Sequence, residues 1–215
     1  NKEEMFKFSN HIISIFLVIS VIAFALGFVF TDNIVAFMFD GFNEEKFNLT
    51  VFLTRITLFN LLFLSINACY TAMLHVCEVF IIPSILGMFF NAPMIIYLIF
   101  FKDISIIGLT IANVIGNFLR VAVQLPVLYK HGYRLKIFID IKDERIKKIL
   151  ILIIPVIIGS GANSLNMVVD IKVASSLGDG AVSALDFAQK IIVFANTAIT
   201  TSIVSVMYPL MANKL

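Results

Sequence analysis

The sequence predicts an all-α fold, a polytopic bundle of six transmembrane helices. The first observation is composition: 60% of the 215 residues are hydrophobic and only 14% are charged, whereas soluble domains are about 45–50% apolar and about 25% charged. The second is length, because the apolar runs reach the roughly 20 residues that a membrane-spanning helix needs. The six predicted spans are residues 11–30, 50–73, 79–101, 104–129, 149–173 and 181–208.

The apolar runs predict helices rather than strands, because they are long and their hydrophobicity does not alternate as it does in barrel strands. In a bilayer only helices and closed barrels satisfy their own backbone hydrogen bonds. Polar or turn-forming residues break the runs, for example at 40–45, 102–103 and 178–180. After the first span, Thr31-Asp32 followed by NIVAFMF is expected to be the N-cap of a short helix at the membrane surface.

The cations are distributed unevenly between the two sets of connecting loops. One set comprises residues 1–10, 74–78, 130–148 and the C-terminus, and it holds ten Lys and Arg residues. The alternate set holds two, Lys46 and Lys102. Cytoplasmic loops carry the excess of Lys and Arg, so we expect the first set, with both ends of the sequence, on the cytoplasmic side.

The segment 130–148 is the extended polar connection of the chain. We interpret it as a basic cytoplasmic linker, part of it at the lipid surface, between a four-span block at 1–129 and a two-span block at 149–215. The sequence starts at Asn1 rather than Met and stops just after an apolar run. We therefore expect it to be part of a longer protein.

Sequence motifs favour no catalytic function. The net charge of +2 gives no indication of a nucleic-acid partner. Cys69 and Cys77 would lie roughly 12 Å apart along one helix, beyond the reach of a disulfide. The three histidines are scattered and match no zinc spacing, and no G-x-S-x-G, Walker A or H-E-x-x-H motif occurs. We expect neither an enzyme nor a bound organic cofactor.

A polar stripe runs along the fourth predicted span. It consists of Asn113, Asn117, Arg120 and Gln124. At about 100° per residue their spacing of i, i+4, i+7 and i+11 places them on one face. Such a stripe either bonds helices together or lines a cavity, and the sequence leaves both open. An arginine at the bilayer centre is costly, so we expect Arg120 to face the bundle interior.

The fifth and sixth predicted spans also carry polar faces. On the fifth, Asn163, Asn166 and Asp170 lie together, either as oxygen ligands for a hard cation or as helix–helix hydrogen bonds. Lys172 points nearly opposite, near the outer end, where it is expected to snorkel to the surface. Arg55 of the second span is expected to do the same.

On the sixth span one face is formed by Ser183, Asp186, Lys190, Thr197 and Thr201. Asp186 and Lys190 are four residues apart with the acid first, which is the better order for an ion pair on a helix. The pair either neutralises itself or presents Lys190 to an anionic substrate.

The last third of the chain contains a recognisable pattern. It comprises Asp170, Ala174-Ser175, Gly180, Val182-Ser183-Ala184-Leu185, Ala188, Lys190 and Pro209. These positions resemble the seventh and eighth helices of the MurJ (MviN) family of lipid II flippases. Upstream, FNEEKF, IIPSILGMFFN and VQLPVLYKHG resemble its third to sixth helices. The resemblance implies a two-lobe exporter fold of the multidrug/oligosaccharidyl-lipid/polysaccharide superfamily, with the last four spans of one lobe and the first two of the other in this chain.

The resemblance also implies a function and residue roles. Family members move lipid II, an undecaprenyl-pyrophosphate-linked precursor, across the bacterial inner membrane by alternating access around a cationic cavity. The family's eighth-helix arginine falls on Lys190, which keeps the charge without the bidentate fork. Gln189 falls where Asn or Asp is common, and Asp170 falls on an aspartate that binds sodium in some members. Arg120 stands where the family often has Gln.

Two sets of side chains are expected to bind ligands. Expected contacts to a lipid-linked anionic substrate are Lys190, Asp186, Arg120 and Gln189. Expected ligands of Na⁺, as a coupling ion, are Asp170, Asn166 and Asn163. Membrane lipids are the other expected partners.

Other functions remain open at this point. A related O-antigen or polysaccharide flippase, a drug/cation antiporter of the same superfamily, and a non-transporting membrane scaffold would all show long apolar spans. A cationic cavity favours a flippase for an anionic lipid, whereas an acidic cavity favours a cation antiporter.

Overall fold

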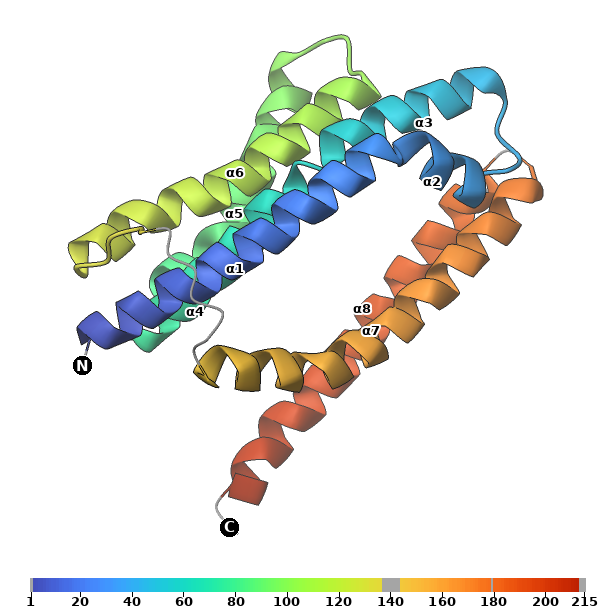
Figure 1. Ribbon diagram of the computed structural model, residues 1–215. Helices are drawn as coiled ribbons and strands as arrows, with labels where there is room; N and C mark the ends of the chain where they lie inside the picture. The colour runs from blue at the N-terminus through green and yellow to red at the C-terminus, as the bar shows by residue number, and fades with distance from the viewer. Residues whose placement is uncertain (1, 137–143, 179, 213–215) are drawn as a thin grey trace. The chain divides into compact units, whose positions relative to one another are not determined.

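A computed structural model describes residues 2–136, 144–178 and 180–212, with side chains for most of them as far as residue 200. The described residues form helices throughout and contain no strand (Figure 1). The helices are α1 (Lys2–Val29), α2 (Thr31–Met38), α3 (Glu44–Thr57), α4 (Asn60–Val76), α5 (Ile81–Phe100), α6 (Ile106–Lys130), α7 (Glu144–Ser176) and α8 (Ala181–Ala212). The prediction of an all-α bundle is confirmed.

Five of the predicted spans correspond to helical stretches long and apolar enough to cross a membrane. Among the described residues these stretches are Phe6–Val29, Glu44–Val76, Ile81–Phe100, Ile106–Lys130 and Ile151–Ser176. The sixth predicted span coincides with α8. The side chains of 201–212, Thr201 included, lie outside those described, so a membrane crossing by α8 stays a prediction.

The second predicted span is interrupted rather than continuous. The hydrogen bond from Leu58 N to Thr54 O is of α-helical type, but Phe59 N donates to Ile56 O at 3.3 Å and Leu61 N to Leu58 O at 3.0 Å. These shorter-range bonds tighten the backbone locally. The span therefore consists of two helices, α3 and α4, separated at Leu58 and Phe59.

The short helix after the first span is confirmed as α2, but the expected N-cap role of Thr31 is wrong. Its hydroxyl donates backwards, to Gly27 O at 2.6 Å and Phe28 O at 3.1 Å. Thr31 is fully buried. Because the preceding residues are already helical, the hydroxyl bonds the last turn of α1 instead of an amide of α2.

The described chain falls into two compact units by its internal contacts. The first comprises residues 1–35 and 44–159, and the second comprises 36–43 and 160–215. The predicted division at 130–148 refers to the lobes of a longer protein and is not tested by these units. Residues 137–143 of that predicted linker lie outside the described residues.

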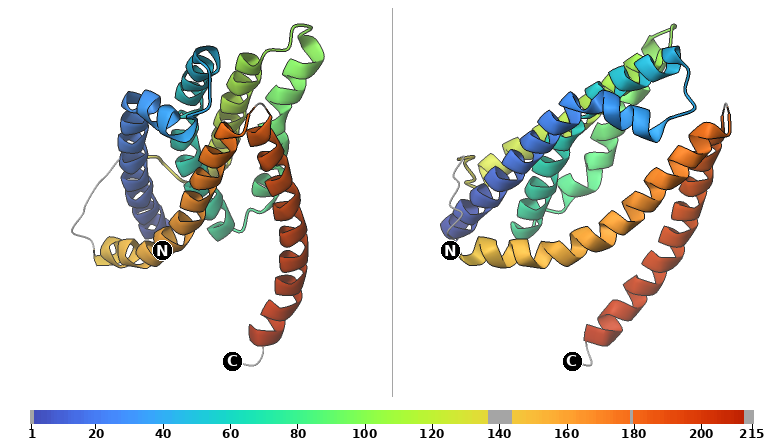
Figure 2. Two further views of the ribbon diagram at one scale, coloured as in Figure 1. Left: turned by 90° about the vertical axis from the view of Figure 1, so that its right-hand side faces the viewer. Right: turned by 45° about the vertical axis from the view of Figure 1, so that its right-hand side comes forward.

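In the first unit α4 contacts α1, α5 and α6, and α5 and α6 pack as a hairpin (Figure 1). In the second unit the end of α7 and the start of α8 meet at the turn that connects them, and the two helices diverge away from it (Figure 2). Gly178 and Gly180 in this turn have φ of 112° and 87°, a conformation that side-chain-bearing residues rarely adopt.

An aromatic cluster ties together one end of the first unit. Tyr133 is fully buried, and its ring lies edge-on to Phe6 and Tyr70, with centroids 5.7 and 6.0 Å away. Burial raises the pKa of the Tyr133 phenol, which keeps its proton and donates to Asn10 Oδ1 at 2.6 Å. Asn10 in turn donates to the Arg134 carbonyl at 2.8 Å.

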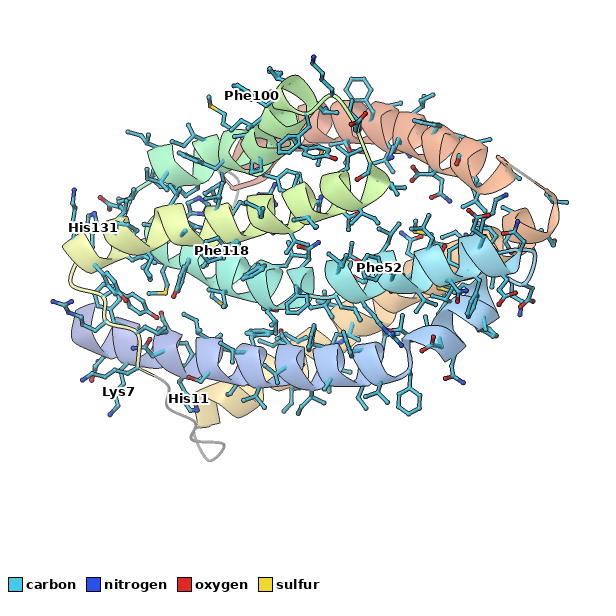
Figure 3. All side chains as sticks on the ribbon, turned by 90° about the horizontal axis from the view of Figure 1, so that it is seen from above. Lys7, His11, Phe52, Phe100, Phe118 and His131 are labelled. Carbon is cyan, nitrogen blue, oxygen red and sulfur yellow. The ribbon has the colours of Figure 1, made fainter. Side chains whose placement is uncertain are left out.

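This cluster brings the start of α1 and the end of α6 to the same end of the unit, where Figure 3 shows Lys7, His11 and His131. Two loops of the predicted cation-rich set therefore share an end. Because the Tyr133 side chain is buried, a cysteine placed there would not report which side of the membrane this loop faces.

Hydrogen-bonded amides join α4 to α6. Asn60 Nδ2 donates to Asn113 Oδ1 at 2.9 Å, and Asn117 Nδ2 donates to Asn60 Oδ1 at 3.0 Å. Two turns further along, Gln124 Nε2 donates to Asn67 Oδ1 at 2.8 Å while its oxygen accepts from Thr71 at 3.0 Å.

We call these six side chains the amide seam. They are Asn60, Asn67, Thr71, Asn113, Asn117 and Gln124. For three of the four residues in the predicted α6 stripe, the structure thus favours helix–helix hydrogen bonding over cavity lining.

We predict that Asn117→Leu lowers the stability of the full-length protein, because Asn117 is 6% exposed and bonds across helices. Interhelical hydrogen bonds in membranes contribute about 0.6 kcal/mol on average and up to roughly 1.7. Asn91→Leu is the matched control, since Asn91 is exposed and, among the described residues, its amide bonds the Gly87 carbonyl of its own helix. Thermal unfolding in detergent should give a lower Tm for Asn117→Leu than for Asn91→Leu. Equal values would contradict a stabilising seam.

Candidate functional site

A groove with a volume of about 510 Å³ lies in the second unit. Its lining residues are Met167 of α7 and, on α8, Asp186, Gln189, Lys190, Val193, Phe194 and Thr197. The α8 residues recur every three or four positions, so they form one helical face. The structure therefore gathers three expected substrate residues, Asp186, Gln189 and Lys190, on a single face beside apolar surface.

The ion pair expected from the spacing of Asp186 and Lys190 is present. Lys190 Nζ lies 2.6 Å from Asp186 Oδ2, and the two side chains are 67% and 49% exposed. The ammonium also lies 5.5 Å from the centre of the Phe187 ring. Because both side chains are exposed among the described residues, the Lys190 ammonium is open to a second anion as well as to Asp186.

Arg120 lies in the first unit and does not join the amide seam. Its guanidinium carbon sits 4.1 Å from the centre of the Phe90 ring of α5. Its Nε is buried and has no hydrogen-bond partner among the described residues. A cation over an aromatic face is attracted by the ring quadrupole. Arg120 therefore packs between helices, in agreement with the helical-face argument, and keeps hydrogen-bonding capacity unused.

Comparison with known proteins decides the family. The sequence profile described as lipid II flippase MurJ matches residues 1–215, the whole chain. The chain belongs to the lipid II flippase MurJ family.

Individual relatives agree with this assignment. A probable lipid II flippase MurJ of Rickettsia prowazekii is 27% identical over 99% of this chain and 42% of its own length. A probable lipid II flippase MurJ of Vibrio cholerae is 30% identical over 79% of the chain and 33% of its own length. The lipid II flippase MurJ of Burkholderia cenocepacia is 23% identical over 77% and 33%. The chain thus spans well under half the length of these relatives.

The MurJ family resemblance implies a sodium site at Asp170, and the residues fit it in part. Asp170 is half-buried, and Asn166 Nδ2 donates to its Oδ2 at 3.4 Å. Rotation of this amide would present its oxygen beside the carboxylate, as a hard cation requires. Asn163 is exposed one turn away. Among the described residues no group of three or more His, Cys, Asp or Glu side chains gathers, so one carboxylate with amide oxygens is what α7 offers.

Two cations of this MurJ family member have partners that the sequence analysis did not foresee. Arg55 was expected to snorkel but pairs with Asp32 of α2, Nη2 to Oδ2 at 2.6 Å. Lys172 likewise pairs with Asp40, at 3.2 Å. Neither acid could be matched to its cation from spacing, because each pair joins different helices or loops.

The α4 half of the amide seam was also missed, although the sequence contains a signal for it. Asn60, Asn67 and Thr71 follow i, i+7 and i+11, so they lie on one helical face as the α6 stripe does. Two polar stripes with matched spacing on neighbouring spans could have predicted a seam.

Proposed function

We propose that this chain forms part of a flippase that moves lipid II, an undecaprenyl-pyrophosphate-linked precursor, across the bacterial inner membrane by alternating access. Membership of the lipid II flippase MurJ family supports the proposal. So does the abundance of exposed apolar side chains on the helices, which suits contact with lipid.

The observation that carries the proposal is the exposed Lys190–Asp186 pair in the α8 groove. Lys190 lies about ten residues into the predicted span, or roughly 15 Å at 1.5 Å per residue, near the midplane where transporters place their sites. A pyrophosphate stripped of water needs cations and charge-assisted hydrogen bonds. We propose that Lys190 exchanges the Asp186 carboxylate for a phosphate.

Two further residues take part in the proposed binding. Gln189 lies in the same groove and offers neutral donors and an acceptor to the uncharged parts of the substrate. Arg120, with its unpartnered Nε, offers a second cation on the first unit. A substrate carrying several negative charges suits more than one cation.

The proposed orientation places both ends of the chain in the cytoplasm. It rests on the loop asymmetry of ten cations to two and on the shared end of two cation-rich loops in the first unit. The membrane would be the bacterial inner membrane, since the proposed precursor is transported there.

We predict that a membrane-impermeant maleimide applied from outside labels Asn43→Cys but not Lys136→Cys. Both positions are exposed, and native cysteines of the full-length protein are replaced beforehand. Lys136→Cys should react once the cells are permeabilised. The reverse labelling pattern would invert the orientation.

We predict that Lys190→Arg retains transport and that Lys190→Ala and Lys190→Glu lose it. Loss of a charge-assisted contact to phosphate should lower lipid II transport by tenfold or more, equivalent to about 1.4 kcal/mol. The measurement is complementation of a flippase-depleted strain, together with an assay of lipid II exposed on the outer leaflet. Lys102→Ala, in the loop after α5, is the control with the same loss of charge.

Full complementation by Lys190→Ala would assign Lys190 to packing and place substrate binding elsewhere. Complementation failure with normal lipid II exposure would instead favour a different lipid-linked substrate. Membrane insertion and thermal stability of each variant are measured in parallel, so that loss of folding is recognised.

We predict that Asp170→Ala abolishes stabilisation of the full-length protein by Na⁺, because it removes the carboxylate of the proposed site. Thermal unfolding is compared in NaCl and in an equal concentration of choline chloride, which keeps ionic strength constant. Asp103→Ala, outside the helices, serves as the control. An unchanged Na⁺ response in Asp170→Ala would leave this carboxylate with a structural role alone.

A further inference from the structure

The last residues of α2 and those that lead from it to α3 pack against the end of α7. Residues 36–43, here called the strap, belong by their contacts to the second unit, although residues on both sides of them belong to the first. Lys172 Nζ lies 3.2 Å from Asp40 Oδ2 and 4.2 Å from the centre of the Phe37 ring. One cation of α7 therefore holds two side chains of the strap.

The backbone of the strap also touches α7. Ala174 and Ser175 are 7% and 3% exposed, and they are the buried residues among those described in the second unit. A Cβ on Gly41 would collide with the carbonyl oxygen of Ser175. Ser175 Oγ donates to Lys172 O at 2.7 Å and lies 3.4 Å from Met38 O. The strap is therefore seated on a defined place, the last turn of α7.

The interactions that hold the strap are nevertheless of a kind that exchanges easily. The side chains of Lys172 and Asp40 are 38% and 56% exposed, and exposed ion pairs contribute little net stability. A groove of about 260 Å³ lies beside Phe37, Asp40 and Lys172, so the charged side of the contact is less closely packed than a protein core. Opening it would break one exposed ion pair, one cation–aromatic contact and the seating of Gly41 on Ser175.

The connectivity of the chain determines what such an opening would do. Val35, directly before the strap, is 2% exposed within the first unit, and α3 begins at Glu44, directly after it. If the end of α7 moves relative to Val35 and Glu44, either the chain bends at the two ends of the strap or the strap leaves Lys172.

We propose that Lys172 latches the strap onto α7 and that this latch opens during the transport cycle. The inference rests on the proposed function, since a cycle of alternating access supplies the movement. Lys172 then acts as a conformational residue rather than a substrate ligand: its charge selects the state in which the strap is seated.

The first test measures the strap directly and requires no substrate. Spin labels are attached at Ala36→Cys in the strap and Leu177→Cys after α7, both exposed, in the full-length protein in lipid nanodiscs. Lys172→Ala should lower the ratio of short to long distances by about fivefold, the size of effect expected for an exposed ion pair with an aromatic contact. Lys102→Ala, a control with the same loss of charge, should leave the ratio unchanged.

Charge reversal separates a latch from a folding defect. Asp40→Lys alone and Lys172→Asp alone should each release the strap, and the two changes together should restore the short distance. A distance distribution that neither single change alters would overturn the proposal, as would a double variant no better than the single ones.

The second test asks whether opening is needed for transport. Asp40→Cys and Lys172→Cys are joined by a short, reducible bifunctional thiol reagent. Lipid II exposure should stop while the link is intact and resume after reduction, and full transport by the linked protein would overturn the proposal. If the unlinked parent moves no lipid II, the proposed function fails, and the spin-label distances still decide whether Lys172 is a latch.

Discussion

The amide seam between α4 and α6 carries much of the organisation of the first unit. A side-chain amide in hydrocarbon has no water to bond, so it needs a partner within the protein, and in the seam that partner lies on the neighbouring helix. Asn60 meets Asn113 and Asn117, and Gln124 meets Asn67 and Thr71. Because these bonds form in only one register, they fix α6 along the length of α4. The α5–α6 hairpin and the aromatic cluster around Tyr133 are positioned from there.

Charged side chains in the membrane also need partners, and they differ in where those partners lie. Arg55 and Lys172 pair with acids on other segments, Asp32 and Asp40, and so connect parts of the structure. Lys190 pairs only with Asp186 of its own helix among the described residues and stays 67% exposed. An intrahelical partner ties no elements together. In the proposed function, Lys190 can therefore turn its charge to a ligand without breaking a contact between helices.

The two units of the chain contribute differently to the proposed transport. The first is held by interhelical hydrogen bonds and an aromatic cluster, which resist internal rearrangement. The described part of the second has two buried residues, Ala174 and Ser175, both beneath the strap. Its α8 groove is open, and its polar groups are accessible. Rigid packing in the first unit and an accessible charged face in the second suit a transporter whose parts move as rigid bodies.

Much of this molecule follows from the sequence because the relevant interactions are local. Long apolar runs give the helices, polar breaks give most of their ends, and spacing of four residues gives the Asp186–Lys190 pair. Spacing also places Asn113, Asn117 and Gln124 on one face, but it cannot say whether that face meets a helix or a cavity. The partners of Gln124, the pairing of Arg55 with Asp32 and the seating of the strap on α7 were decided by tertiary structure. Each joins residues far apart in sequence, such as Met38 and Ser175, which are 137 positions apart. Which distant segments become neighbours depends on how all the helices pack together, and the spacing of residues along a single helix does not determine this.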